Sequence, residues 1–203
     1  MIEWITIWIV LWGFFMGLPN YLFKKYKINY HEYSWQHSLF YIFSIFIVCA
    51  VYKDFFALYF VDIKSVLTFF VLFFAIWILI PRLFKKDYYN SKKERLLYQI
   101  PKFFEILFQQ FCFLGGLLTF GFAPAIFGLV FFFLHIPVLL FIPKSFSLVF
   151  ISGSLVGGII FASAQSFGSY GFIISLLIHL VFYLSFHALL TSGRLPNISP
   201  HRR

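Results

Sequence analysis

Residues 101–110 (PKFFEILFQQ) place a single carboxylate, Glu105, inside an otherwise apolar segment. An ionisable side chain inside hydrocarbon costs at least ~2.5 kcal/mol even on lenient insertion scales, so it is seldom kept there without a use. Glu105 and Gln109 are four residues apart and share one face of a helix. This polar stripe predicts a helix that faces other helices instead of lipid.

The composition of the whole chain is that of a membrane protein. Of its 203 residues, 62% are hydrophobic, 25% aromatic and only 11% charged, whereas soluble domains carry about 45–50% apolar and ~25% charged residues. We therefore predict a multi-pass protein of a prokaryotic plasma membrane. The 33 phenylalanines are interpreted as lipid-facing filler, with no special aromatic cluster.

Seven apolar stretches are long enough to approach the ~20 helical residues that cross a bilayer core of ~30 Å. They lie at residues 4–22, 37–52, 65–81, 102–121, 122–142, 146–164 and 169–190. The expected fold is accordingly all-α, a bundle of about seven transmembrane helices in one membrane domain. Within it, residues 1–81 supply three packing helices and residues 102–190 a four-helix core.

The basic residues predict the orientation of the bundle. If the N-terminus lies outside, all of the 16 Lys and Arg residues except Lys53 and Lys64 fall on the inner side. The positive-inside rule then gives a cytoplasmic C-terminus, with residues 191–203 as a short tail. Membrane orientation also explains the net charge of +9, so we expect membrane lipids as partners and no nucleic acid.

The connection at residues 82–101 is the longest between the predicted spans. Ser91 and Glu94 have the spacing of a capping box, which predicts a short helix through Ile100. Pro101 then suits the first turn of the next span. The mixture of Tyr, Leu and basic residues is typical of an interfacial helix on anionic headgroups; the alternative is a solvated basic loop that serves only topology.

The polar residues expected at membrane depth all belong to the last four predicted spans. They are Glu105, Gln109, Gln110, His135, Gln165, His179 and His187. A helical rise of 1.5 Å per residue places Glu105 and the three histidines ~5 to ~16 Å from the cytoplasmic face, which predicts a shared pocket opening inward. The alternatives are that Glu105 snorkels toward the interface or pairs with Lys102, and that each histidine simply bonds a neighbouring carbonyl.

Three short motifs follow one another along these spans. Residues 104–110 (FEILFQQ) correspond to a motif of two glutamates, three residues and an arginine, and residues 131–137 (FFFLHIP) match phenylalanine, three residues and histidine followed by an apolar residue and proline. Residues 168–169 (GS) precede His179 and Tyr183. In this order the motifs resemble those of the CPBP family, which includes CAAX prenyl endopeptidases and bacteriocin-processing or immunity (Abi) proteins.

The resemblance implies an intramembrane peptidase. Glu105 and His135 would activate water for hydrolysis of a membrane-delivered peptide, prenylated or a leader, and His179 would donate to the oxyanion. Further supporting groups would be Gln109, Tyr183 and His187. The chain departs from the pattern where Phe104 replaces the first glutamate, Gln109 the arginine and Tyr183 the asparagine.

Two other functions follow from the same residues. Loss of the first glutamate and the arginine suggests a catalytically degenerate member, acting as a membrane scaffold or immunity partner of another membrane protein. Buried Glu and His also build proton relays, so a small transporter is a third interpretation. No cofactor is required; a divalent metal on Glu105, His135 and His179 is a minor alternative, because no tight ligand spacing such as H-E-x-x-H occurs.

Overall fold

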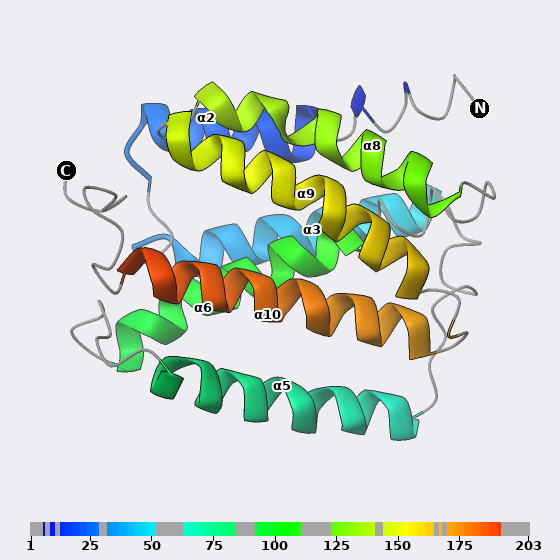
Figure 1. The fold of residues 1–203 in the computed structure, drawn as a ribbon. Coiled ribbons are helices and arrows are strands. Elements are labelled where there is room, and N and C mark those ends of the chain that lie inside the picture. Colours follow the sequence, from blue (N-terminus) through cyan, green and yellow to red (C-terminus); the bar gives the residue numbers. More distant parts are fainter. Residues whose placement is uncertain are drawn as a thin grey trace.

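A computed structural model gives the fold (Figure 1). It describes residues 6, 9–10, 13–28, 32–51, 63–83, 92–110, 123–140, 144–164, 167 and 170–191. All regular structure in these residues is helical, and they contain no strand. The prediction of an all-α fold is therefore confirmed.

Each predicted apolar stretch overlaps a helix, with ends that differ by several residues. The α-helices are α2 (Leu18–Lys25), α3 (Ser34–Val51), α5 (Ile63–Leu83), α6 (Lys92–Gln109), α8 (Pro124–His135), α9 (Lys144–Ala164) and α10 (Gly171–Thr191). A π-helix, η1 (Gly13–Gly17), precedes α2, and a 3-10 helix, η3 (Ile136–Leu140), follows α8.

Helix α6 differs from the prediction, because the boundary expected at Pro101 is absent. One helix runs from Lys92 to Gln109 with Pro101 inside it. The short helix expected before Pro101 and the first helix of the expected four-helix core are therefore one continuous helix. An interior proline removes one backbone hydrogen bond at a typical cost of ~3 kcal/mol. Pro101 is fully buried, and α6 packs against both α3 and α10. This tertiary packing offsets the local cost of the proline.

Two prolines define the ends of α8. Pro124 occupies its first turn, where its missing N–H is not needed, and the preceding Ala123 is extended (φ −61°, ψ 144°). At the other end Pro137 cannot donate to the carbonyl of Phe133, and the N–H of Ile136 bonds that oxygen instead. The chain tightens there into η3, which places His135 as the last residue of α8.

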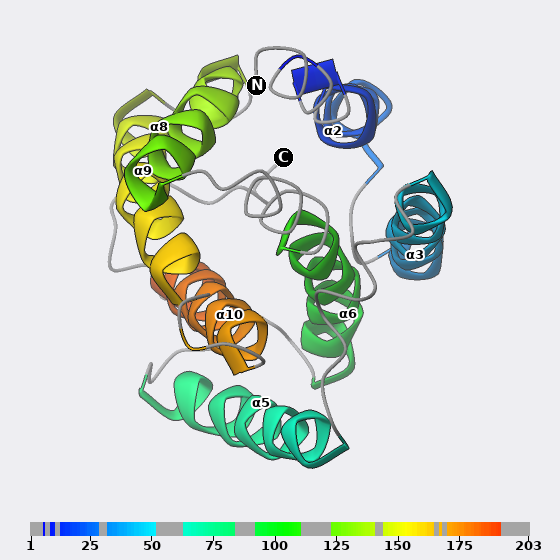
Figure 2. The same ribbon diagram turned by 90° about the vertical axis from the view of Figure 1, so that its right-hand side faces the viewer.

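Consecutive helices alternate in direction. In Figure 1, α3, α6 and α9 run from left to right, and α5, α8 and α10 run from right to left. The most extensive contacts join α8 to α9 and α3 to α6, while α10 contacts α5, α6 and α9. The end view in Figure 2 accordingly has α10 between these three helices.

The outer surface of the bundle is strongly apolar. Exposed fractions reach 66% for Phe43, 68% for Val71, 62% for Phe133 and 64% for Val149. Within the described residues, α9 alone has an 18-residue window apolar enough to cross a membrane, Ser147–Ala164, with a mean hydropathy of 1.9. The apolar stretches Pro124–His135 and Gly171–Ser185 are shorter.

Two glycines let α8 and α9 approach closely. A Cβ on Gly158 would lie 2.9 Å from the Cα of Gly128 and 3.0 Å from the Cβ of Phe131, and a Cβ on Gly128 would lie 2.9 Å from the carbonyl oxygen of Leu155. Gly158 thus allows the backbones of α8 and α9 to pack closely.

We expect Gly158→Ala to destabilise the bundle by about 1–3 kcal/mol, the usual cost of overpacking a tight core, because the added methyl meets backbone and Cβ atoms that cannot rotate away. Gly157→Ala is the matched control, since its Cβ would only touch the ring of Phe161 at 3.5 Å. Thermal unfolding in detergent micelles measures both. Equal unfolding temperatures for the two variants would contradict the proposed glycine contact.

Candidate functional site

Glu105 is buried on α6 and its two oxygens bond to residues of the same helix. Oε2 lies 2.6 Å from the Nζ of Lys102, and Oε1 accepts a hydrogen bond from the Nε2 of Gln109 at 3.2 Å. These partners stand three residues before and four residues after Glu105, where a helix brings side chains onto one face. Pairing with Lys102, one of the alternatives from the sequence, is therefore confirmed.

Lys102 connects this pair to α10. Its Nζ lies 4.9 Å from the centroid of the Tyr183 ring, within the range of a cation–π interaction. The side chain of Lys102 is 15% exposed and that of Glu105 is 5% exposed. The ammonium is thus held between a carboxylate on its own helix and an aromatic face on the neighbouring one.

Three polar side chains form hydrogen bonds between the C-terminal end of α6 and α10. Ser175 Oγ donates to the Oε1 of Gln110 at 2.8 Å, and the Nε2 of Gln110 lies 2.9 Å from the Nδ1 of His179. All three are buried. Because Gln110 donates to His179 in this orientation, Nδ1 is the acceptor and the ring proton of neutral His179 resides on Nε2.

His135 holds its proton on the other ring nitrogen. Its Nδ1 lies 2.6 Å from the carbonyl oxygen of Phe131, one turn earlier on α8. A carbonyl can only accept, so Nδ1 carries the proton and the Nε2 of neutral His135 bears the lone pair. The two neutral histidines are therefore opposite tautomers: Nε2 is the basic nitrogen of His135, and Nε2–H is the ring donor of His179.

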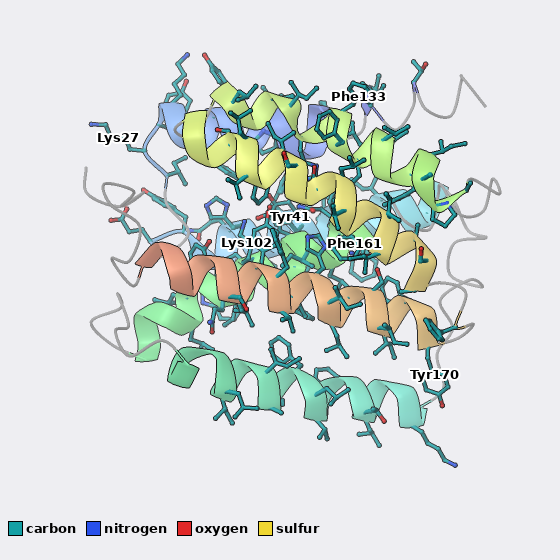
Figure 3. All side chains as sticks on the ribbon, in the orientation of Figure 1. Lys27, Tyr41, Lys102, Phe133, Phe161 and Tyr170 are labelled. Carbon is teal, nitrogen blue, oxygen red and sulfur yellow. The ribbon has the colours of Figure 1, made fainter. Side chains whose placement is uncertain are left out.

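Aromatic rings lie against both histidines, so the interpretation of phenylalanine as lipid-facing filler does not hold for the buried phenylalanines of this region. The ring centroid of Phe131 lies 4.4 Å from that of His135 and 6.3 Å from that of His179. Phe161 stacks on His179 at 4.7 Å, and Phe150 contacts His135 at 5.6 Å. Phe131, Phe150 and Phe161 are buried, whereas Phe133 is exposed, as Figure 3 also shows for Phe161 and Phe133.

Glu105, His135 and His179 thus come from α6, α8 and α10 into one buried region. Shared neighbours link them: the ring of Phe131 contacts both His135 and His179, and Lys102, the partner of Glu105, lies against Tyr183. Tyr183 joins the group, with its ring 5.4 Å from that of His179. Among the described residues, no three His, Cys, Asp or Glu side chains form a group that could hold a metal ion.

The side chains of two other predicted residues lie outside the described structure. His187 lies on α10, and only its backbone belongs to the described structure; Gln165 lies outside the described residues. A cleft between α5, α6 and α10 is bordered by Lys102 and Tyr183, but Glu105, His135 and His179 do not line it. This cleft is therefore a different one from the shared, inward-opening pocket expected around these three residues, which stays a prediction.

The sequence alone did not identify Ser175, Phe150 or Phe161 as parts of the site, whereas Phe131 belonged to the second motif and Tyr183 was expected as a supporting residue. Ser175 precedes His179 by four residues on the same helix face, a spacing that could have indicated it. Nothing in the sequence distinguishes Phe150 and Phe161 from the many phenylalanines that face outward.

No family model, curated protein or solved structure matches this chain. A functional assignment accordingly depends on the site residues themselves and on the three motifs that contain them.

The ion pair should be measurable as a coupling in stability. Removing one partner of a buried pair leaves an uncompensated charge, which typically costs about 3–5 kcal/mol. We expect Lys102→Met and Glu105→Gln each to destabilise the protein, and the double variant to recover most of that loss. A double-mutant cycle on unfolding in micelles provides the test. Additive losses would show that the two side chains are not coupled.

Proposed function

We propose that the chain is a multi-pass protein of a prokaryotic plasma membrane with about seven spans. The large apolar side chains that cover its outer surface support this, because water-soluble monomers rarely expose such extended apolar patches. The alternating helix directions are those of a chain that crosses a bilayer repeatedly.

A cytoplasmic position for one end of the bundle follows from its charge. The end of α2 with Lys25 and the first turn of α6 lie at the left in Figure 1, where Figure 3 labels Lys27, while α5 begins with Lys64 at the opposite end. The positive-inside rule then gives an outer N-terminus and a cytoplasmic C-terminus.

Within this membrane protein we infer an intramembrane endopeptidase resembling the CPBP family. The observation that supports the inference is the set of hydrogen bonds made by two buried histidines, which assigns opposite tautomers to His135 and His179. Amide hydrolysis requires a base for water and a donor for the oxyanion, and these two nitrogens have those properties. A membrane-delivered peptide is the expected substrate.

In the proposed reaction, the Nε2 of His135 takes a proton from water as the water oxygen attacks the scissile carbonyl carbon. The Nε2–H of His179 donates to the resulting oxyanion. Collapse of the tetrahedral intermediate breaks the C–N bond, and His135 returns the proton to the leaving amine. Glu105 stabilises the transient imidazolium through its charge instead of acting as the base, since Lys102 and Gln109 bond its oxygens.

Cells producing the protein should contain new peptide termini that depend on the site. We expect His135→Ala to lower their yield at least about 100-fold, the usual contribution of a general base, and Glu105→Gln to lower it as well. Mass spectrometry of N-termini in the membrane and secreted fractions measures this. Phe133→Ala, on the exposed face of α8 two residues from His135, serves as the control, and termini that persist in both site variants would refute peptidase activity.

A non-catalytic function is the second candidate, favoured by the ion pair. Lys102 occupies one oxygen of the Glu105 carboxylate at 2.6 Å, and the sequence lacks the first glutamate and the arginine of the motif. The chain would then bind another membrane protein as a scaffold or an immunity partner.

For this candidate we expect a stable membrane protein to co-purify with the chain and to remain bound to the His135→Ala variant, because binding does not need the base. Affinity purification in mild detergent with quantitative mass spectrometry measures the association. New termini in the wild-type cells, absent from those with His135→Ala, would instead favour the peptidase.

A further inference from the structure

The connection between α2 and α3 exposes lysine together with large aromatic side chains. Lys25 and Lys27 are exposed, and so are Tyr26 (63%), Tyr33 (39%) and Trp35 (67%). We call these five residues the turn surface. In Figure 1, α2 ends and α3 begins at the same end of the bundle, and in Figure 3 the labelled Lys27 projects outward there. Tyrosine and tryptophan are enriched at the headgroup level of membranes, so this surface has the composition of a lipid contact.

Lys27 keeps a long side chain at a backbone position that favours glycine. Its φ is 54°, in the left-handed region that residues other than glycine seldom adopt. The N–H of Ile28 bonds the carbonyl oxygen of Phe23 at 2.8 Å, so α2 ends in a Schellman motif with Lys27 at the position that glycine usually takes. Strained backbone of this kind clusters at functional sites, which points to a use for the Lys27 ammonium.

The two lysines of the turn surface can meet an external anion. In the part of the chain that the structure describes, neither ammonium forms an ion pair, and the Nζ of Lys25 lies 5.6 Å from the ring centroid of Tyr26. Glu32, the acidic residue nearest in sequence, pairs with neither lysine. The turn surface therefore carries positive charge at the end of the bundle that we assign to the cytoplasm, where membranes hold anionic lipids.

We propose that the turn surface binds the headgroups of anionic phospholipids, with Lys25 and Lys27 beside the phosphates and the rings of Tyr26 and Trp35 at headgroup depth. A phosphate free in solution would contact only the lysines, whereas a lipid bilayer also covers the exposed rings. The membrane lipid is thus the ligand that uses the whole surface. The proposal rests on the proposed membrane placement of the chain and is independent of peptidase activity.

Quenching of Trp35 fluorescence in reconstituted bilayers tests the headgroup preference. The other tryptophans are replaced by phenylalanine: Trp4, Trp8, Trp12 and Trp77. The bilayer is an equal mixture of dioleoyl phosphatidylglycerol and dioleoyl phosphatidylcholine, and the chains of one or the other lipid are brominated. We expect brominated phosphatidylglycerol to quench Trp35 more strongly, because only its headgroup has a net negative charge.

Lys27→Gly separates a lipid contact from a structural function. Glycine adopts a φ of 54° without strain, so the unfolding temperature in neutral detergent should equal or exceed that of the wild type. The preference for phosphatidylglycerol should nevertheless fall about fivefold, the effect of one basic residue near an anionic surface. Lys27→Arg keeps the charge and should keep the preference. Lys64→Gln, at the opposite end of the bundle, should leave it unchanged.

Native mass spectrometry of the same lysine variants with all five tryptophans present gives a second measurement of lipid preference, independent of the phenylalanine replacements. Equal quenching by the two brominated lipids, or an undiminished preference in Lys27→Gly, would overturn the proposal and leave the membrane placement intact. If neither brominated lipid quenched Trp35, both the proposal and the membrane placement of this end of the bundle would be wrong.

Discussion

The ion pair between Lys102 and Glu105 is the constraint on which the rest of the bundle depends. A charge removed from water needs a partner within a few ångströms and further polar contacts, or the fold does not tolerate it. Lys102 provides the partner at 2.6 Å and Gln109 adds a hydrogen bond. Helix α6 must therefore turn this face inward and lie among other helices, as it does between α3 and α10.

Hydrogen bonds between helices then fix the relative position of α6 and α10. Gln110 bonds both Ser175 and His179, which are four residues apart on α10. A shift by one residue along either helix would turn these buried groups away from their partners, and each unsatisfied group would cost about 1–3 kcal/mol. The bond from Gln110 also sets the tautomer of His179. The hydrogen bonds that align the two helices therefore leave the ring proton of His179 on Nε2, where it can be donated.

The sequence predicted the helices better than it predicted their contacts. Apolar runs predict that each helix exists, because length and hydropathy are local properties. The spacing of Glu105 and Gln109 likewise predicted that they share one inward face of a helix. The continuous course of α6 through Pro101 was not, since burial against neighbouring helices outweighs a local rule. The assignment of Phe131 to the core and Phe133 to the surface also depends on packing, because the phenylalanines of α8 are chemically identical.

The helix that carries His135 is positioned in a different way, through close packing at two glycines. It ends α8, whose most extensive contact is with α9, and the closest approach of the two helices occurs at Gly128 and Gly158. That approach brings Phe131 against Phe161, and Phe161 in turn stacks on His179. The relative position of the two histidines therefore depends on two positions that have no room for a methyl group, one of them two helical turns before His135. Residues that contact neither histidine can thus govern whether base and donor act on the same bond.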